Sequence, residues 1–111
     1  MSELELKTLL ETILIGTNPI PVAYDHFEQF PTTQKVVPPF ILYRNTNTTT
    51  IKADDKVFVK DNNYIVDLIT EVKNVVLEEQ LETLFNDNHL PYDKEEDYIS
   101  DERIYQIRYF I

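Results

Sequence analysis

Cysteine is absent from this 111-residue chain, and glycine occurs once. Without cysteine there is no disulfide framework, no thiolate zinc site and no cysteine nucleophile. With one glycine there is no glycine-rich loop that could hold a phosphate. Apolar runs such as Phe40–Tyr43 are far too short to cross a bilayer. No basic-then-apolar leader opens the chain, so we expect a cytosolic protein without a signal peptide.

Basic residues are outnumbered, because ten lysines and arginines face twenty aspartates and glutamates, for a net charge of −10. Proteins that bind nucleic acid neutralise phosphates with a basic face. The balance therefore argues against specific nucleic-acid binding and against docking on an anionic membrane. The excess is concentrated in residues 71–102, which hold eleven acids and two bases. Its simplest meaning is solubility and self-repulsion.

Patterns for catalysis or metal binding are weak. The two histidines, His26 and His89, lie far apart in the chain, whereas paired metal ligands on one element lie three or four residues apart. The only serines, Ser2 and Ser100, suit a helix cap and a turn. We therefore expect no catalytic residue, no metal and no cofactor.

Carboxylates and aromatic residues each leave an alternative open. Glu95, Glu96 and Asp97 could bind a hard cation with help from a neighbour, but a solvated edge strand protected from aggregation by its charge is favoured. Six aromatic residues could stack on single-stranded nucleic acid, yet they lack interleaved lysine and arginine and suit a core better. These six are Tyr24, Phe27, Phe40, Tyr43, Phe58 and Tyr64.

Two amphipathic helices are predicted. In residues 2–15 leucine and isoleucine recur at helical spacing, Ser2 can cap the first turn with Glu5, and Gly16 can end the helix in the left-handed conformation. The expected core includes Leu9 and Ile13 from this segment.

The second helix begins after the cap residue Asn74 and ends at residues 86–88. Glu78, Glu79 and Glu82 are expected to face water. The apolar stripe that faces the core contains Leu77, Leu81, Leu84 and Phe85.

Strands and hairpins account for the rest of the chain. Phe40–Tyr43 is a continuous apolar run, typical of a central strand covered on both faces, and Leu42 is expected in the core. Asp61, Asn62 and Asn63 predict a tight turn between two strands. In the last strand Tyr105, Ile107, Tyr109 and Ile111 share one face. The predicted strands are 22–27, 40–43, 56–60, 64–69, 92–99 and 103–111.

This order of elements, with many hairpins and no regular alternation of strand and helix, predicts one α+β domain over residues 1–111. We expect a largely antiparallel sheet with two helices packed on one face.

The polar stretch Arg44–Thr50 has low complexity and no periodicity. It is typical of a mobile loop or of the frayed tip of a long hairpin. We expect it to bind a partner and to become ordered on assembly. The candidate partner-binding residues are Thr46, Asn47, Thr48, Thr49 and Thr50.

Several motifs occur in a familiar order after the leucine-rich N-terminal helix. They are Pro21–Phe27, Pro38–Tyr43, Ala53–Phe58, Asn63–Leu68, Leu77–Glu82 and Tyr105–Tyr109. In this layout the chain resembles small proteins from the head–tail gene clusters of long-tailed phages and prophages of Gram-positive bacteria. Among these it is most similar to tail-completion or tail-terminator proteins. The resemblance covers nearly the whole chain and lies in packing and turn motifs.

The resemblance implies a small α+β domain that assembles as a ring, usually a hexamer, without catalytic residues. Such a ring caps the finished tail tube and offers a surface for joining the head. The implied partners are further copies of the chain, the tail tube protein and a head-completion protein. The implied location is the host cytoplasm during assembly and then the head–tail junction of the virion. Ring subunits associate through unlike surfaces, for which sheet edges are suited.

Two other functions stay open. One is a head-closure or connector protein of the same junction, and the other is an acidic regulatory protein that mimics DNA. Within the ring hypothesis, the acidic residues of the last hairpin face either the DNA channel or the outer rim. These candidates are Glu95, Glu96, Asp97, Asp101 and Glu102.

Overall fold

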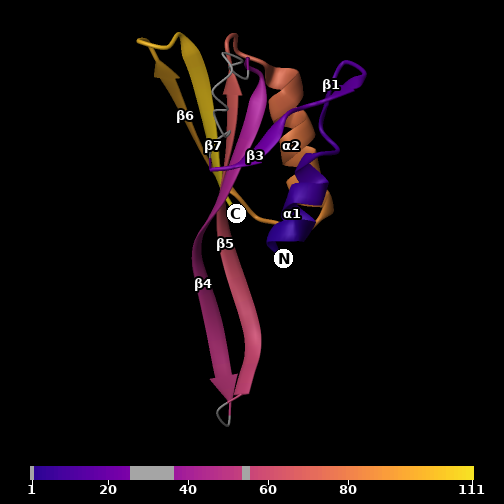
Figure 1. The fold of residues 1–111 in the computed structure, drawn as a ribbon, viewed down its shortest axis with the longest axis vertical. Coiled ribbons are helices and arrows are strands. Elements are labelled where there is room, and N and C mark those ends of the chain that lie inside the picture. The colour runs from indigo at the N-terminus through magenta and orange to yellow at the C-terminus, as the bar shows by residue number, and fades with distance from the viewer. Residues whose placement is uncertain (1, 26–36, 54–55) are drawn as a thin grey trace, which may run out of the picture.

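The computed structural model describes residues 2–25, 37–53 and 56–111, and for 47–53 and 56–62 it describes the course of the backbone. Figure 1 shows a sheet with both helices on the same side and one long hairpin that extends away from them. The elements are α1 (Glu3–Leu10), β1 (Leu14–Ile15), β2 (Asn18–Pro19), β3 (Val22–Tyr24), β4 (Phe40–Ala53), β5 (Lys56–Thr70), α2 (Val75–Asp87), β6 (Asp93–Ile99) and β7 (Ile104–Phe110).

Five of the strands form one sheet in the order β3-β4-β5-β7-β6, and β1 and β2 form a separate two-stranded ribbon. β3 pairs with β4 in parallel, whereas the pairs β4–β5, β5–β7 and β6–β7 are antiparallel. The predicted α+β class with a largely antiparallel sheet is therefore confirmed. β6 lies at the edge of the sheet, as its run of charges indicated.

The hydrophobic core lies between the sheet and the helices. Alternate residues of β5 face it, and β7 continues the same face, because Ile107 and Tyr109 pair in register with Leu68 and Val66. Both helices add side chains to this one cluster, and each member below is at most 2% exposed. They are Leu6 and Leu10 from α1, Leu77, Leu81 and Phe85 from α2, and Tyr64, Val66, Leu68, Ile107 and Tyr109 from the sheet.

Of the residues expected in the core, Ile13, Leu81 and Phe85 are buried as predicted. Leu9, Leu42 and Leu84 are partly buried. Strand β4 explains one of these differences. Its residues alternate, so that Ile41 and Tyr43 point into the core while Leu42 lies on the opposite face of the sheet.

Helix α1 begins as predicted and ends early. The Ser2 hydroxyl accepts a hydrogen bond from the backbone N–H of Glu5 at 3.2 Å. The helix stops at Leu10, where the Thr12 hydroxyl donates to the Leu9 carbonyl at 2.6 Å and competes with the helical ladder. The prediction that Gly16 ends this helix is wrong. Gly16 has the expected positive φ of 62°, but it uses it in the turn between β1 and β2.

Helix α2 has the predicted cap, because the Asn74 side chain accepts from the Leu77 N–H at 3.2 Å. It ends at Asp87, and His89 follows in the left-handed conformation with φ 56°. No helix of the described ranges is both long and apolar enough to span a membrane.

The hairpin of β4 and β5 is much longer than predicted. Its distal part pairs residues 47–53 with residues 56–63, and we name residues 47–53 and 56–62 the arm. Figure 1 shows the arm leaving the sheet and extending away from β1 and α2. The tight turn predicted at Asp61, Asn62 and Asn63 is wrong, because all three lie within β5 and pair with β4.

The prediction of a mobile loop at Arg44–Thr50 is also wrong, since these residues belong to strand β4. The register shifts between Asn45 and Asn47, which leaves Thr46 as an extra residue in a bulge. The hydroxyl of Thr46 donates to the Asn63 carbonyl at 3.1 Å. The alternative, a frayed tip of a long hairpin, holds in part: a long hairpin forms, but Arg44–Thr50 lie within its paired strand β4, which continues to Ala53, and are not its tip.

The remaining strands follow the prediction more closely. β6 and β7 form the last hairpin, and Tyr105, Ile107 and Tyr109 lie in register with the core face of β5. The strand expected at 22–27 is β3, which covers Val22–Tyr24. His26 and Phe27, which belong to that prediction, lie outside the described residues.

Candidate functional site

The described residues show no arrangement for metal binding. Within residues 2–25, 37–53 and 56–111, no group of three or more histidine, aspartate or glutamate side chains could hold an ion. His89 is exposed in the turn that follows α2, as its position in the sequence indicated. Glu95 and Asp97 lie on one face of β6 and Glu96 on the other, so the three carboxylates do not converge.

The acidic candidates of the last hairpin do not form one strip. Glu95 and Asp97 lie in register with Arg108 and Gln106, on the face of the sheet away from the core. Glu96 lies opposite Ile107 on the core face and pairs with the ammonium group of Lys73. The other two candidates, Asp101 and Glu102, lie in the turn between β6 and β7, and all five are exposed. The reason for the split is the twofold alternation of a strand.

Glu78 was expected to face water, and this prediction is wrong. Its side chain is 4% exposed and lies between α2 and β6, where it is held by two lysines. Lys94 Nζ lies 2.8 Å from Glu78 Oε1, and Lys73 Nζ donates a hydrogen bond to the same oxygen at 2.9 Å and lies 2.9 Å from Oε2 as an ion pair. A buried carboxylate is tolerated in a fold when cations replace its lost hydration.

The electrostatics of this network favour its charged form. Burial acts to raise the pKa of Glu78, but the hydrogen bonds from Lys94 and Lys73 outweigh it and lower the pKa below its usual range. Burial acts to lower the pKa of Lys94, and Glu78 and Glu82 outweigh it, so this pKa is raised. The hydrogen bond to Glu96, followed by that to Glu78, raises the pKa of Lys73. All three groups are therefore charged at neutral pH.

Two tyrosines extend the network into the core. The hydroxyls of Tyr92 and Tyr109 each donate to Glu82 at 3.1 Å, and Lys94 lies 3.3 Å from the same carboxylate. Burial, and then the charge of Glu82, raises the pKa of Tyr109 far above its usual value. Both hydroxyls remain protonated donors, and their rings pack edge to face with centroids 5.6 Å apart. The network links β6 and β7 to α2.

On the other face of the sheet, Arg108 forms a two-point ion pair with Asp67. Nε of Arg108 lies 2.8 Å from Oδ1, and Nη2 lies 3.2 Å from Oδ2. The two residues are direct partners in the register of β5 and β7. The hydrogen bond to Asp67 raises the pKa of Arg108 above its usual value. The predicted alternation of β7 placed Arg108 on this face, but only strand pairing identifies its partner.

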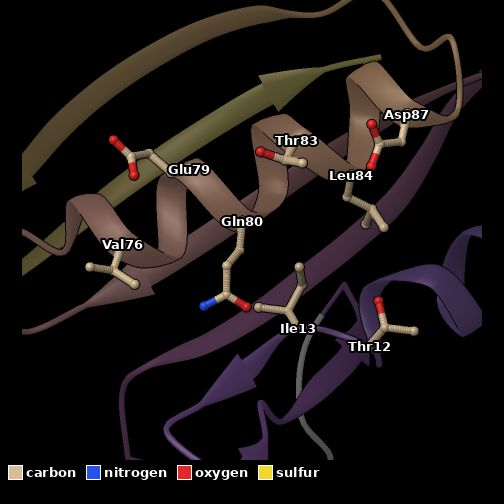
Figure 2. A pocket seen from close by; sticks show the side chains of 8 residues that line it. All are labelled: Thr12, Ile13, Val76, Glu79, Gln80, Thr83, Leu84 and Asp87. Atoms are coloured by element: carbon tan, nitrogen blue, oxygen red, sulfur yellow. The ribbon is translucent and has the colours of Figure 1, made fainter.

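A groove lies between helix α2 and the segment that follows α1. It has a volume of about 420 Å³. Figure 2 shows Gln80 and Leu84 pointing from α2 toward Ile13, with Glu79 on the outer flank of the helix and Asp87 near its end. The lining thus combines three apolar side chains with two threonines, one glutamine and two carboxylates, and it was not identified from the sequence.

One side chain ties the two walls of this groove together. The Gln80 amide oxygen accepts from the Leu14 N–H at 3.1 Å, and the Gln80 amide nitrogen donates to the Leu14 carbonyl at 3.0 Å. The side chain therefore pairs with the backbone of β1 in the manner of a neighbouring strand. This contact fixes β1 against α2, so the groove is a formed feature of the fold.

The arm is the other candidate surface. β3 pairs with residues 41–43 of β4, and β7 pairs with residues 65–70 of β5. Among the described strands, the two strands of the arm therefore pair with each other alone. Four of the five candidate partner-binding residues, Asn47 to Thr50, lie in the arm, and Thr46 forms the bulge at its base.

Comparisons of this chain with protein-family models, with curated proteins and with solved structures gave no match.

Proposed function

We propose that this protein is a structural subunit of the head–tail junction of a long-tailed phage, and that it acts as the tail terminator. In this role, copies of the chain form a ring on the finished tail tube. The resemblance of its ordered motifs to tail-completion proteins is the reason for naming this junction. The partners are further copies of the chain, the tail tube protein and a head-completion protein.

The observation that carries the proposal is the arm. A two-stranded ribbon without further packing is marginally stable alone in water. Strand edges that lack a partner are ready sites for another chain. A protein that keeps such an arm is therefore suited to work by binding its neighbours in an assembly.

The acidic last hairpin has a place in this proposal. Glu95 and Asp97 project together from the outer face of the edge strand β6. If this face lines the ring channel, its charge keeps a passing duplex from being held, because DNA carries a phosphate charge every ~1.7 Å along its axis. On the outer rim the same residues would serve solubility.

Deletion of the gene from a phage or prophage that carries it tests the proposed role. A tail terminator predicts filled heads that are not joined to tails, together with tails of irregular length, in electron micrographs. A head-closure protein predicts tails of normal length and heads that lose their DNA. Normal virions from the deletion strain would contradict both roles and favour a regulatory function.

A further inference from the structure

Strand β6 ends the five-stranded sheet, and its outer edge is open. Among the described strands, β6 pairs with β7 alone, in an uninterrupted register from Asp93 to Ile99. Every residue of β6 except Ile99 is exposed, and Figure 1 shows β6 as the outermost strand of the sheet. In an antiparallel pair every second residue points its N–H and C=O away from the partner strand. The outer edge therefore presents a row of backbone groups to which a further strand can bind.

The edge is held in place from the core face of the sheet. The ammonium group of Lys94 lies 2.8 Å from the buried carboxylate of Glu78 on α2. One step along the strand pattern, Glu96 pairs with Lys73, which precedes the same helix. β6 is therefore fixed against α2 before any partner arrives, so a strand that binds its edge does not have to order it first.

The charges on the opposite face of β6 decide which strand fits. Asp93, Glu95 and Asp97 lie on that face at intervals of two residues, about 7 Å apart at ~3.4 Å per residue. In the part of the chain that the structure describes, none of the three has an ion-pair partner. Arg108, which pairs in register with Glu95, is held by two hydrogen bonds to Asp67. Because directly opposite side chains on paired strands are close neighbours, a strand beside β6 must bring positive charges to these positions.

The core face of the same strand adds an apolar contact. The ring of Tyr98 packs beside Tyr105 of β7 with centroids 4.8 Å apart, and Tyr98 is still 54% exposed. An aliphatic side chain on a neighbouring strand can cover the exposed part of this ring. The fitting segment is thus extended, with basic residues at alternate positions and aliphatic residues between them.

We propose that β6 binds a basic extended segment of a partner protein, which adds to the sheet as a further strand. A second copy of this chain does not suit the edge, because two paired β6 strands would set carboxylates against carboxylates. The charge of one sign therefore excludes copies of β6 and admits basic strands. The inference goes beyond the proposed function. At a head–tail junction the partner would be a neighbouring protein, but the contact does not depend on that setting.

Titration of the whole chain with synthetic peptides tests the edge. The probe is a peptide as long as β6, which has seven residues, in which valine and lysine alternate. We expect its binding, followed by NMR, to shift the backbone amide signals of β6 and to slow their hydrogen exchange, while the amides of α1 stay unaffected. Calorimetry of the same titration gives the dissociation constant.

Two control peptides separate strand pairing from plain attraction to an acidic protein. One has the same composition with its lysines in a single block, so its charges do not match the alternation of β6. The other carries methyl groups on its backbone nitrogens, which removes its N–H donors and keeps its charge. Both should bind at least about tenfold more weakly than the alternating peptide, because each lacks one part of the pairing.

Charge reversal on the chain gives the matched test. Glu95→Lys with Asp97→Lys should raise the dissociation constant of the alternating peptide at least about tenfold. The same variant should bind a peptide with glutamate in place of lysine more tightly than the wild type does. Asp101→Lys with Glu102→Lys makes the same change of charge in the turn beyond the strand, and should alter the constant by no more than about twofold. All four residues are exposed, and circular dichroism checks that both variants fold.

The alternatives give different outcomes. Equal binding of the alternating and block peptides would overturn the proposal, because it would show attraction to an acidic surface alone. β6 amides that respond to no peptide would also overturn it and leave the charges as protection of the edge against aggregation. Slowed exchange of the β6 amides that grows with protein concentration, without peptide, would overturn it in favour of a second copy. None of these results bears on the tail-terminator role, which the deletion strain tests separately.

Discussion

At the scale of single residues, the buried Glu78 carboxylate joins α2 to Lys94 of β6 and to Lys73, which precedes the helix. The cap at Asn74 and the positive φ of Gly16 follow from residue chemistry that needs no tertiary context. Glu78 was misjudged because its partner Lys94 lies on β6, and nothing in the pattern of α2 reveals a cation on another element. From the helical periodicity of α2 alone, Glu78 was predicted to face solvent together with its neighbour Glu79.

The Glu78 network predicts a pH-dependent contribution to stability. The pKa of Glu78 is lowered in the folded protein, so its stabilising effect is fully present above the pKa of an unfolded glutamate and is lost as pH falls through the folded value. Glu78→Gln should lower the free energy of unfolding at pH 7 by about 1–3 kcal/mol, since it leaves Lys94 and Lys73 poorly paired. Chemical denaturation across the acidic range measures this difference.

In that experiment the difference between wild type and Glu78→Gln should shrink as the pH falls. Glu79→Gln is the matched control, because Glu79 is exposed and adjacent in the sequence, and it should change stability little. Equal stability of Glu78→Gln and wild type at neutral pH would show that the lysines do not stabilise the fold through this carboxylate.

At the scale of elements, strand alternation predicted β7 correctly because a period of two is set by each strand alone. The arm was missed for the opposite reason. Asparagine and aspartate at 61–63 favour turns locally, and only pairing with residues 47–49 of β4 holds them in a strand. The threonines of β4 have the β-branched side chains that suit such pairing, although their polarity suggested a loop.

Helix α2 predicts a graded response to truncation of its leucines. Leu81→Ala should cost about 2–5 kcal/mol of unfolding free energy, because Leu81 is fully buried. Leu84→Ala should cost about half as much, since Leu84 is partly exposed at the groove. Urea denaturation of the two variants gives the comparison. A larger loss of unfolding free energy for Leu84→Ala than for Leu81→Ala would contradict the observed packing, in which the Leu81 side of α2 faces the core.

The arm should be dispensable for folding. Asn45 and Tyr64 are direct register partners, so an Asn-Gly turn can join them in place of residues 46–63. We expect this shortened chain to unfold cooperatively within a few degrees of the wild type, since the core cluster lies in the sheet and helices that remain. Self-association should be lost. Thermal unfolding by circular dichroism, with light scattering on the same samples, checks both results, and a non-cooperative transition would make the arm part of the folding unit.

At the scale of the whole molecule, the acidic face of β6 predicts an effect on DNA movement. Glu95→Lys with Asp97→Lys changes two exposed residues of one face and spares Glu96, which pairs with Lys73. If this face lines the channel, virions that contain the variant should assemble and eject their DNA slowly or incompletely. Fluorescence assays of ejection measure this, with Asp101→Lys and Glu102→Lys in the adjoining turn as the control. Normal ejection would place the face on the outer rim.

If this chain is a fixed part of the head–tail junction, as we propose, its position in the particle must lie there. Immunogold electron microscopy of virions and of isolated tails, with antibody against the purified chain, locates it. We expect label at one position, between head and tail in virions and at the head-proximal end of free tails. Label along the tail, label inside the head or none on purified particles would contradict it.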